Sequence, residues 1–193
     1  QRQMCIRDRN NPDPLQPFWN RATQGTYAPG SPFKPVTAIA ALETGIITPK
    51  STILTKGVYH YGDWAYKCWL YNQNGGTHGR IDVTEAIKVS CNYFFYDIGR
   101  RTGISTIARY ASAFGLGEPT GIEIPEKIGV MTTPDYVNSL DGHYWTDGQT
   151  LTAAIGQSYS LFTPLQLANY VATLAGGGTR YNAHLLKEVR TYD

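Results

Sequence analysis

The hydrophobic positions of this chain follow a helical period in several stretches. In residues 104–114 apolar side chains recur every three or four positions, so we predict a helix that ends near Gly115. Thr163, Pro164 and Gln166 form a typical helix start, because threonine can cap the first turn and proline is tolerated at its first position. This second helix should run to about Ala175, where three consecutive glycines follow.

Two more helices are predicted around residues 82–103. Residues 82–85 read Asp-Val-Thr-Glu, the spacing of a capping box, and apolar residues continue to Val89. The Ser-Cys-Asn triplet at 90–92 interrupts this run, and serine and asparagine favour caps and turns because their side chains compete for backbone hydrogen bonds. The triplet should therefore lie at a junction with a further helix, which ends near Gly103, where side chains can point into a cleft.

Strand signals are short and scattered. Residues 52–55 and 57–61 are β-prone pieces between turn clusters, and residues 121–125 and 184–189 are also expected to be strands. Residues 10–30 are rich in Pro, Asn and Gln and should form an irregular lead-in. The pattern as a whole predicts a helix-rich member of the mixed α and β class.

Composition limits the classes of protein that this chain can represent. With 193 residues, 41% hydrophobic and 17% charged, it can fold as one globular domain. The net charge of +2 and the lack of a basic stripe indicate no nucleic-acid partner. No run of 18 apolar residues exists that could cross a membrane.

The cysteines carry no zinc signature. Cys68 and Cys91, with His60 and His78, lack the close paired spacing of zinc sites, so we predict no metal and no cofactor. Cys68 and Cys91 could form a disulfide in an oxidising compartment or remain buried thiols, and the sequence leaves both open.

Residues 1–9 differ in composition from the rest and show neither a helical nor a strand period. We interpret them as a non-native cloning or sequencing-adapter scar, which leaves residues 10–193 as the domain. Because the chain does not begin with Met, we expect it to be part of a longer protein.

Ser31 and Lys34 form the candidate chemical centre. Prolines 32 and 35 are tolerated only near a helix start, so Ser31 is predicted to be the N-cap of a helix that ends near Gly45. Residues three apart share a helix face, which lets the lysine amine reach the serine hydroxyl. A serine hydroxyl needs such a base, and the helix dipole should lower the lysine pKa. A capping serine with a lysine at the surface is the structural alternative.

With these motifs in place, the chain resembles the transpeptidase domain of penicillin-binding proteins, more narrowly a monofunctional class B enzyme. The resemblance covers roughly residues 20–193 and includes, in order, Ser31-x-x-Lys34, residues 77–87, Ser90-x-Asn92, and residues 114–117, 120–122, 154–157 and 163–168. It implies a serine β-lactamase/transpeptidase-like fold, an antiparallel sheet covered by helices, here as an incomplete, helix-rich part.

The resemblance also implies roles for four residues. Ser31 would attack the carbonyl between the two terminal D-alanines of a peptidoglycan stem peptide, and Lys34 would take its proton. Ser90 could relay a proton to the departing D-alanine, and Asn92 could hydrogen-bond both Lys34 and the substrate backbone. An amine from a second stem peptide would then form the cross-link, and β-lactam antibiotics would leave Ser31 acylated. Simple helix capping is the structural alternative for Ser90 and Asn92, and Cys91 is expected to point into the core.

One departure from the family pattern is important. The family's third motif, Lys-Thr/Ser-Gly, follows soon after a strand like residues 184–189, and this chain stops short of it. That strand supplies half of the oxyanion hole, and losing one donor costs on the order of 3 kcal/mol. The isolated chain is therefore expected to be inactive and poorly stable.

Three other functions share parts of this pattern: a class D-type serine β-lactamase, a β-lactam sensor domain and an inactive scaffold. We rank them below the transpeptidase because residues 77–87 and 163–168 resemble class B transpeptidases. The resemblance further implies a place outside the bacterial cytoplasmic membrane, anchored by an N-terminal helix absent from these residues. It also implies a membrane glycosyltransferase partner and a role in cell shape or cell division.

Overall fold

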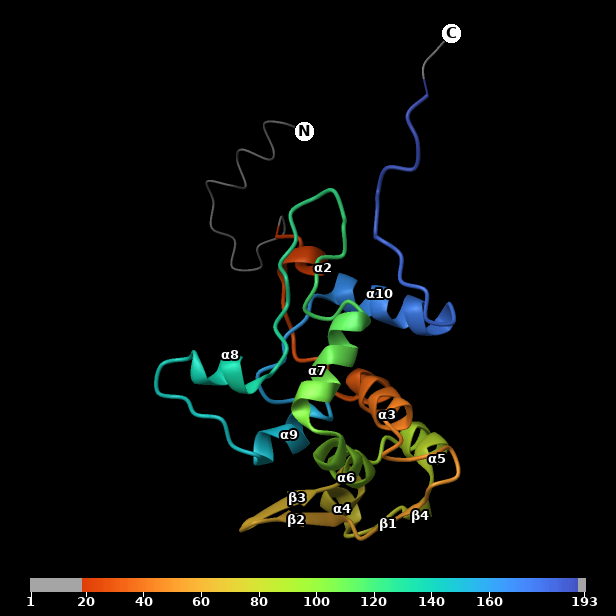
Figure 1. Ribbon diagram of the computed structural model, residues 1–193, viewed down its shortest axis with the longest axis vertical. Helices are drawn as coiled ribbons and strands as arrows, with labels where there is room; N and C mark the ends of the chain where they lie inside the picture. Colours follow the sequence, from red (N-terminus) through yellow and green to blue (C-terminus); the bar gives the residue numbers. More distant parts are fainter. Residues whose placement is uncertain (1–18, 191–193) are drawn as a thin grey trace.

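Three helices form the centre of the computed structural model, which describes residues 19–190. They are α3 (Lys34–Glu43), α6 (Asn92–Thr102) and α7 (Ile104–Ala113). Helix α6 contacts both of the others and also α9 (Gly148–Ala153), as Figure 1 shows. Its apolar face carries Phe94, Phe95 and Ile98, which are fully buried in the main hydrophobic core. Burial of this face on three neighbours is what positions α6.

Two small antiparallel sheets cover one end of α6. Strand β1 (Ile53–Thr55) pairs with β4 (Gly79–Ile81), and β2 (Val58–Tyr61) pairs with β3 (Trp64–Lys67). Helix α6 packs against β1, β2 and β3 below it in Figure 1. The strands predicted at 52–55 and 57–61 are confirmed.

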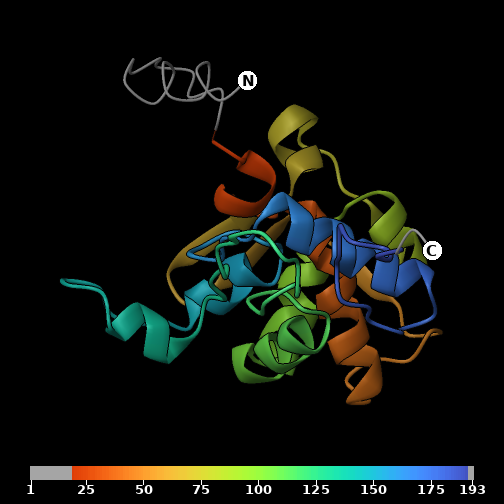
Figure 2. The same ribbon diagram turned by 90° about the horizontal axis from the view of Figure 1, so that it is seen from above.

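Five further helices complete the described part of the chain. They are α2 (Arg21–Gln24), α4 (Trp69–Asn74), α5 (Val83–Lys88), α8 (Pro134–Asn138) and α10 (Pro164–Ala175). Figure 2, seen from above, shows α10 lying across the central helices. A second buried cluster, which contains residues of α3, α7 and α10, joins these helices.

Two helix starts predicted from side-chain caps, at Asp82 and Thr163, are confirmed. The Asp82 side chain accepts a hydrogen bond from the backbone N–H of Glu85, and α5 follows it directly. Thr163 and Gln166 form a reciprocal capping box at the start of α10. Gly115 adopts φ +85 just after α7, as its predicted stop requires.

Two predicted strands are wrong. Residues 121–125 and 184–189 are irregular, and no strand of residues 19–190 pairs with either. The Glu123 carboxylate instead accepts hydrogen bonds from the backbone N–H groups of Leu185 and Leu186. A β-prone sequence becomes a strand only when its backbone finds a partner. The lead-in at 10–30 also contains the one-turn helix α2, capped by Asn20, and residues 1–9 lie outside the described part.

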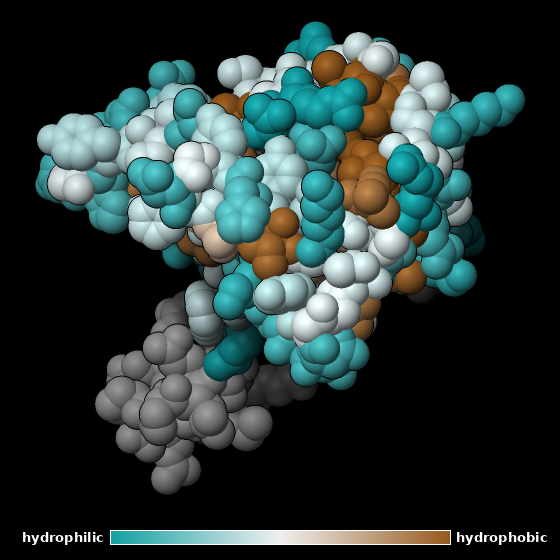
Figure 3. All heavy atoms as spheres, turned by 90° about the horizontal axis from the view of Figure 1, so that it is seen from below, coloured by the Kyte–Doolittle hydropathy of each residue, from teal (hydrophilic) through white to brown (hydrophobic). Residues whose placement is uncertain are grey.

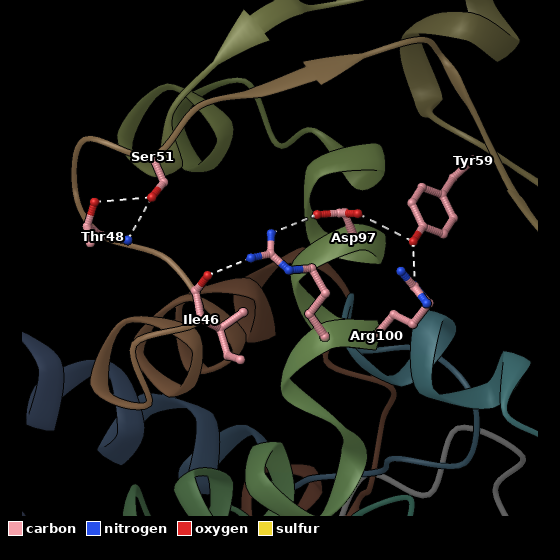
Figure 4. Close-up of polar contacts among 7 residues, drawn as sticks. Ile46, Thr48, Ser51, Tyr59, Asp97 and Arg100 are labelled. Atoms are coloured by element: carbon pink, nitrogen blue, oxygen red, sulfur yellow. Dashed lines mark hydrogen bonds and ion pairs between the residues drawn. The ribbon is translucent and has the colours of Figure 1, made fainter.

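A polar network ties α6 to its surroundings (Figure 4). The guanidinium of Arg101 donates to Asp97 at 3.2 Å and to the carbonyl of Ile46 at 2.7 Å. Arg100 donates to the hydroxyl of Tyr59 on β2 at 2.8 Å. These contacts fix the helix whose first residue belongs to the Ser-Cys-Asn triplet.

The surface is mixed in character. Figure 3 shows apolar groups, in brown, among polar ones on the face seen from below. Among residues 19–190, none of the helices has the length and hydropathy needed to cross a membrane.

Candidate active site

The chain enters α3 through a glycine. Gly30 has φ +61 and ψ −146, and its carbonyl accepts a hydrogen bond from the N–H of Phe33 at 2.9 Å. The prediction that Ser31 is the N-cap is therefore wrong, because Gly30 takes that place and Ser31 begins a 3₁₀ turn (Ser31–Phe33). A positive φ is costly for any residue with a Cβ, which explains the glycine. The N–H of Gly30 donates to the carbonyl of Gly156 at 2.8 Å, which holds the turn against the core.

Lys34 is buried beneath this turn, with only 2% of its surface exposed. Its ammonium has three protons and three acceptors: the carbonyl of Ser90 at 2.9 Å, the Ser90 hydroxyl at 2.8 Å and the Asn92 amide oxygen at 2.6 Å. A buried cation needs such complete pairing. Helix α3 thus contributes a lysine whose position is set by the junction between α5 and α6.

Ser31 joins this group through Ser90. The hydroxyl of Ser90 lies 2.9 Å from that of Ser31, and the side chain of Ser31 is on the exposed side. Within residues 19–190 the hydrogen bonds of Lys34 go to Ser90 and Asn92, and not directly to Ser31. The predicted contact between lysine and serine is therefore bridged by a second hydroxyl.

Ser90 lies in a backbone conformation that is rare for serine. Its φ is +51, in the left-handed region. Its N–H donates to the carbonyl of Ile87, and the N–H of Cys91 donates to that of Ala86. This pair of bonds is the Schellman motif that ends many helices, in which glycine usually takes the left-handed position. Ser90 therefore ends α5 while directing its hydroxyl toward Lys34.

Burial changes the acidity of the lysine. Removal from water is the main cause, and it lowers the pKa of Lys34 from its ordinary value to about 8. The nearby sulfurs of Cys68 and Cys91 oppose this shift. The sequence predicts that the helix dipole lowers the pKa of Lys34, whereas in the structure the main cause is desolvation. A lysine with this pKa is partly neutral near pH 7 and can accept a proton.

Behind the triplet lies a group of residues that could hold a metal. Cys68, His78 and Cys91 bring one ligand atom each within 4.8 Å of one another. Both cysteines are free thiols and are fully buried, as expected for Cys91. Cys68, His78 and Cys91 therefore lie close together in the structure even though their sequence spacing is not that of a zinc site. His60 is not part of the group. Only the proximity of three separate segments creates it, so no local signal could have found it.

The four predicted residues Ser31, Lys34, Ser90 and Asn92 thus lie in one hydrogen-bonded group, while their chemical roles remain predictions. A cavity of about 580 Å³ between the β2–β3 hairpin and α9 is lined by none of them. The sequence motifs do not identify Gly30 and Gly156, which support the turn. The available signal was Gly30 itself, because a glycine directly before Ser31 indicates a backbone conformation that other residues avoid.

Comparison with known proteins gives a consistent result. The family model for the penicillin binding protein transpeptidase domain matches residues 4–193. The chain is 35% identical over 182 residues to "Peptidoglycan D,D-transpeptidase MrdA" of Escherichia coli strain K12, covering 90% of this chain and 27% of that protein. It is 36% identical over 178 residues to the protein of the same name from Salmonella typhimurium, covering 88% of this chain and 27% of that protein. The chain thus spans about a quarter of the length of these curated relatives.

Solved structures agree with this assignment. A crystal structure of Pseudomonas aeruginosa PBP2 in complex with WCK 5153 matches with a TM-score of 0.84 and 32% identity, covering 92% of this chain and 40% of that one. A complex between penicillin-binding protein PBP2 and MreC from Helicobacter pylori matches with a TM-score of 0.82 and 30% identity, covering 90% and 32%. The mixed, helix-rich fold predicted from the sequence is confirmed.

Proposed function

Because the chain belongs to the penicillin-binding protein transpeptidase family, we propose that it supplies the acylation centre of a peptidoglycan D,D-transpeptidase. The observation that carries this proposal is the hydrogen-bond chain from Lys34 Nζ through the Ser90 hydroxyl to the Ser31 hydroxyl. It connects an exposed nucleophile to a buried amine with a lowered pKa.

The chain of hydrogen bonds supports a specific proton path. When Lys34 is neutral, hydroxyl rotation lets Ser31 donate to Ser90 and Ser90 donate to Lys34. As the Ser31 oxygen bonds to the carbonyl carbon of D-alanyl-D-alanine, its proton moves to Ser90 and the proton of Ser90 moves to the amine. The bond to the terminal D-alanine nitrogen then breaks, and this nitrogen takes a proton back through Ser90. The acyl group stays on Ser31.

The second half of the reaction follows the same path in reverse. An amine from another stem peptide attacks the acyl carbon and loses a proton through Ser90 to Lys34. The bond between the acyl carbon and the Ser31 oxygen then breaks, and this oxygen takes the proton back through Ser90. β-Lactams present a strained amide to the same hydroxyl and leave it acylated. Asn92 stays bonded to Lys34 and orients it, and its amide N–H₂ would donate to the substrate backbone.

The wider setting is part of the same proposal. The domain would act outside the bacterial cytoplasmic membrane, held by an N-terminal helix beyond these residues. One similar solved structure is described as "Structural coordination of polymerization and crosslinking by a peptidoglycan synthase complex". A similar pairing with a membrane glycosyltransferase would deliver new glycan strands to Ser31.

The test is to identify the acylated residue. The complete protein that contains this chain should be labelled with radioactive penicillin, digested, and the tagged peptide sequenced. We expect the label on Ser31, no labelling of Ser31→Ala, and full labelling of Ser105→Ala, which replaces an exposed serine on α7. Label on another residue would overturn the proposal. Rapid release of the label over many turnovers would instead identify a β-lactamase.

A further inference from the structure

Two neighbouring cavities open where the β2–β3 hairpin meets α9 and the end of α6 (Figure 1). The larger has a volume of about 580 Å³ and lies between the hairpin and the first residues of α9. The smaller, of about 360 Å³, is lined by Arg100 of α6, the start of α7 and Trp145. Because Tyr61 and Asp147 line both, the two cavities are adjacent and form one elongated groove, which we name the hairpin groove.

The hairpin groove is lined by several aromatic rings. Trp64, the first residue of β3, is 73% exposed beside the larger cavity, and Trp145 lines the smaller one. Tyr61 and Tyr66 add two further rings to the larger cavity. Aromatic side chains gathered around one hollow leave large apolar faces in water, which is typical of a binding site. Each cavity thus has its own tryptophan.

The shape of the groove is fixed by close packing. The ring of Tyr66 packs against Tyr96 of α6 with 5.6 Å between ring centres. Its hydroxyl lies so close to Gly148, the first residue of α9, that a side chain at this position would collide with it. The guanidinium of Arg100 lies over the ring of Tyr61, 5.8 Å from its centre. The groove is therefore formed in advance, which lowers the entropy cost of binding a ligand.

Polar groups at the rim of the groove have unused hydrogen-bonding capacity. Within residues 19–190 the carboxylate of Asp63 has no hydrogen-bond or ionic partner. The carboxylate of Asp147 receives a long contact of 3.4 Å from the Tyr61 hydroxyl. The amide oxygen of Gln149 accepts from the N–H of Thr146 at 2.9 Å, which leaves its N–H₂ group as a donor. These groups can bind the hydroxyls of a ligand.

The distribution of charge favours a neutral ligand over a cation. Asp63 and Asp147 are acidic, but Arg100 brings a positive charge to the smaller cavity and already lies over the ring of Tyr61. A ligand with apolar faces and many hydroxyls suits both the rings and the rim groups. Saccharides have this character, because the C–H groups of a pyranose ring cover an aromatic face while its hydroxyls reach the polar groups around it.

We propose that the hairpin groove binds a saccharide chain, which stacks on Trp64 in the larger cavity and on Trp145 in the smaller one. The larger cavity has the size of a small-ligand site, about 300–1,000 Å³. That the chain is a peptidoglycan strand rests on the proposed function, because stem peptides are attached to a polysaccharide. The groove then holds the strand beside α6, which begins at Asn92, and raises the local concentration of the attached stem peptide near the reaction centre.

The test measures saccharide binding by the complete protein that contains this chain. The probes are the neutral di- and tetrasaccharide of β-1,4-linked N-acetylglucosamine, titrated by calorimetry. We expect the tetrasaccharide to bind more tightly, because it reaches both cavities. Trp64→Ala should weaken its binding about tenfold or more, as loss of a central aromatic contact commonly does. Trp145→Ala should weaken binding of the tetrasaccharide more than that of the disaccharide.

Tyr181→Ala is the matched control, because Tyr181 is 71% exposed and lines neither cavity. This variant should bind both probes as the unaltered protein does. Circular dichroism of each variant separates loss of binding from loss of fold. Saturation transfer from the protein to the sugar C–H groups, measured by NMR on the unaltered protein, detects the stacking without any variant.

Three results would overturn the proposal. They are no binding of the tetrasaccharide at millimolar concentration, binding that Trp64→Ala leaves unchanged, and displacement of the sugar by an isolated stem peptide with a free ammonium, which would reassign the groove to a cation. Labelling of Ser31 by penicillin is measured on the same preparation. Labelling without saccharide binding would overturn this inference alone, whereas saccharide binding without labelling would overturn the proposed function and leave the groove a saccharide site.

Discussion

Ser90 occupies a backbone position at which glycine is usual, so replacing it tests whether serine is present for its hydroxyl alone. Ser90→Gly and Ser90→Ala both delete the hydroxyl that joins Lys34 to Ser31. They differ in the backbone, because only glycine adopts φ +51 without cost. The comparison of these two variants therefore separates the contribution of the backbone from that of the side chain.

The expected difference in stability can be estimated. A left-handed conformation costs a residue with a Cβ about 1–2 kcal/mol. The greater freedom of glycine in the unfolded chain offsets about 0.4–1 kcal/mol of this. The free energy of unfolding of Ser90→Gly should therefore exceed that of Ser90→Ala by about 0.5–1 kcal/mol, since both lose the same hydrogen bonds.

The effect on the reaction should be the same in both variants. Proton transfer through a positioned group contributes about 10²- to 10⁴-fold to a rate, so acylation should fall at least about 100-fold in each. Unfolding in denaturant gives the stability, and labelling of the complete protein with fluorescent penicillin gives the rate. Ser158 is the matched control, because its φ is +71 and it lies outside the hydrogen-bonded group.

At Ser158 the same two substitutions should show the same difference in stability with no loss of labelling. Equal stability of Ser90→Gly and Ser90→Ala would show that the turn is not strained. Labelling of either variant at the original rate would show that the hydroxyl lies outside the proton path.

Three further predictions concern the lysine, the glycine turn and a helix cap. The neutral amine is the active form and the pKa of Lys34 is about 8, so penicillin acylation should rise from pH 7 to pH 9 and then level off. A flat pH profile of the unaltered protein would contradict this expectation. Lys34→Arg stays protonated and should lower the acylation rate about 10²- to 10⁴-fold, whereas Lys88→Arg on the surface of α5 should leave the rate unchanged. Gly156→Ala places a methyl group against the backbone of the turn before Ser31, whereas Gly142→Ala at the same φ of +72 meets nothing within 4 Å. Thermal unfolding should show the former about 1–3 kcal/mol less stable than the latter, and equal stability would rule out the close contact. Thr163→Ala should lower the free energy of unfolding in denaturant by about 1 kcal/mol because the capping box is lost, and an unchanged value would show that the cap contributes nothing.

The parts of the fold that could be predicted are those decided by neighbouring residues. Asp82 and Thr163 start helices because each side chain bonds to a backbone N–H three positions ahead. Ser31 has the same local signal, and there the prediction fails. Gly30 takes the capping place because its backbone is bonded to Gly156, which is 126 positions away in the chain and was invisible to a local rule.

Strands and clusters depend on distant partners and were harder to predict. Residues 58–61 form a strand because residues 64–67 follow within a short turn and pair with them. Residues 184–189 find no such partner strand within residues 19–190, and the N–H groups of Leu185 and Leu186 donate to the carboxylate of Glu123 instead. The proximity of Cys68, His78 and Cys91 could not be predicted for the same reason, because no regular spacing in the sequence connects these residues.

At the turn formed by Ser90, local preference and structure disagree in two places, and the disagreements depend on each other. A lysine that avoids burial is placed in the core, and a serine that avoids left-handed backbone is placed where glycine belongs. The two unfavourable features stabilise each other, because the left-handed turn presents both the carbonyl and the hydroxyl of Ser90 as acceptors to the buried ammonium of Lys34. Neither would persist alone, since the lysine without these acceptors would be an unpaired buried charge and the turn without the lysine would favour glycine. Both departures from local preference therefore occur at the residues that we propose as base and proton relay, as expected where selection for chemistry overrides selection for stability.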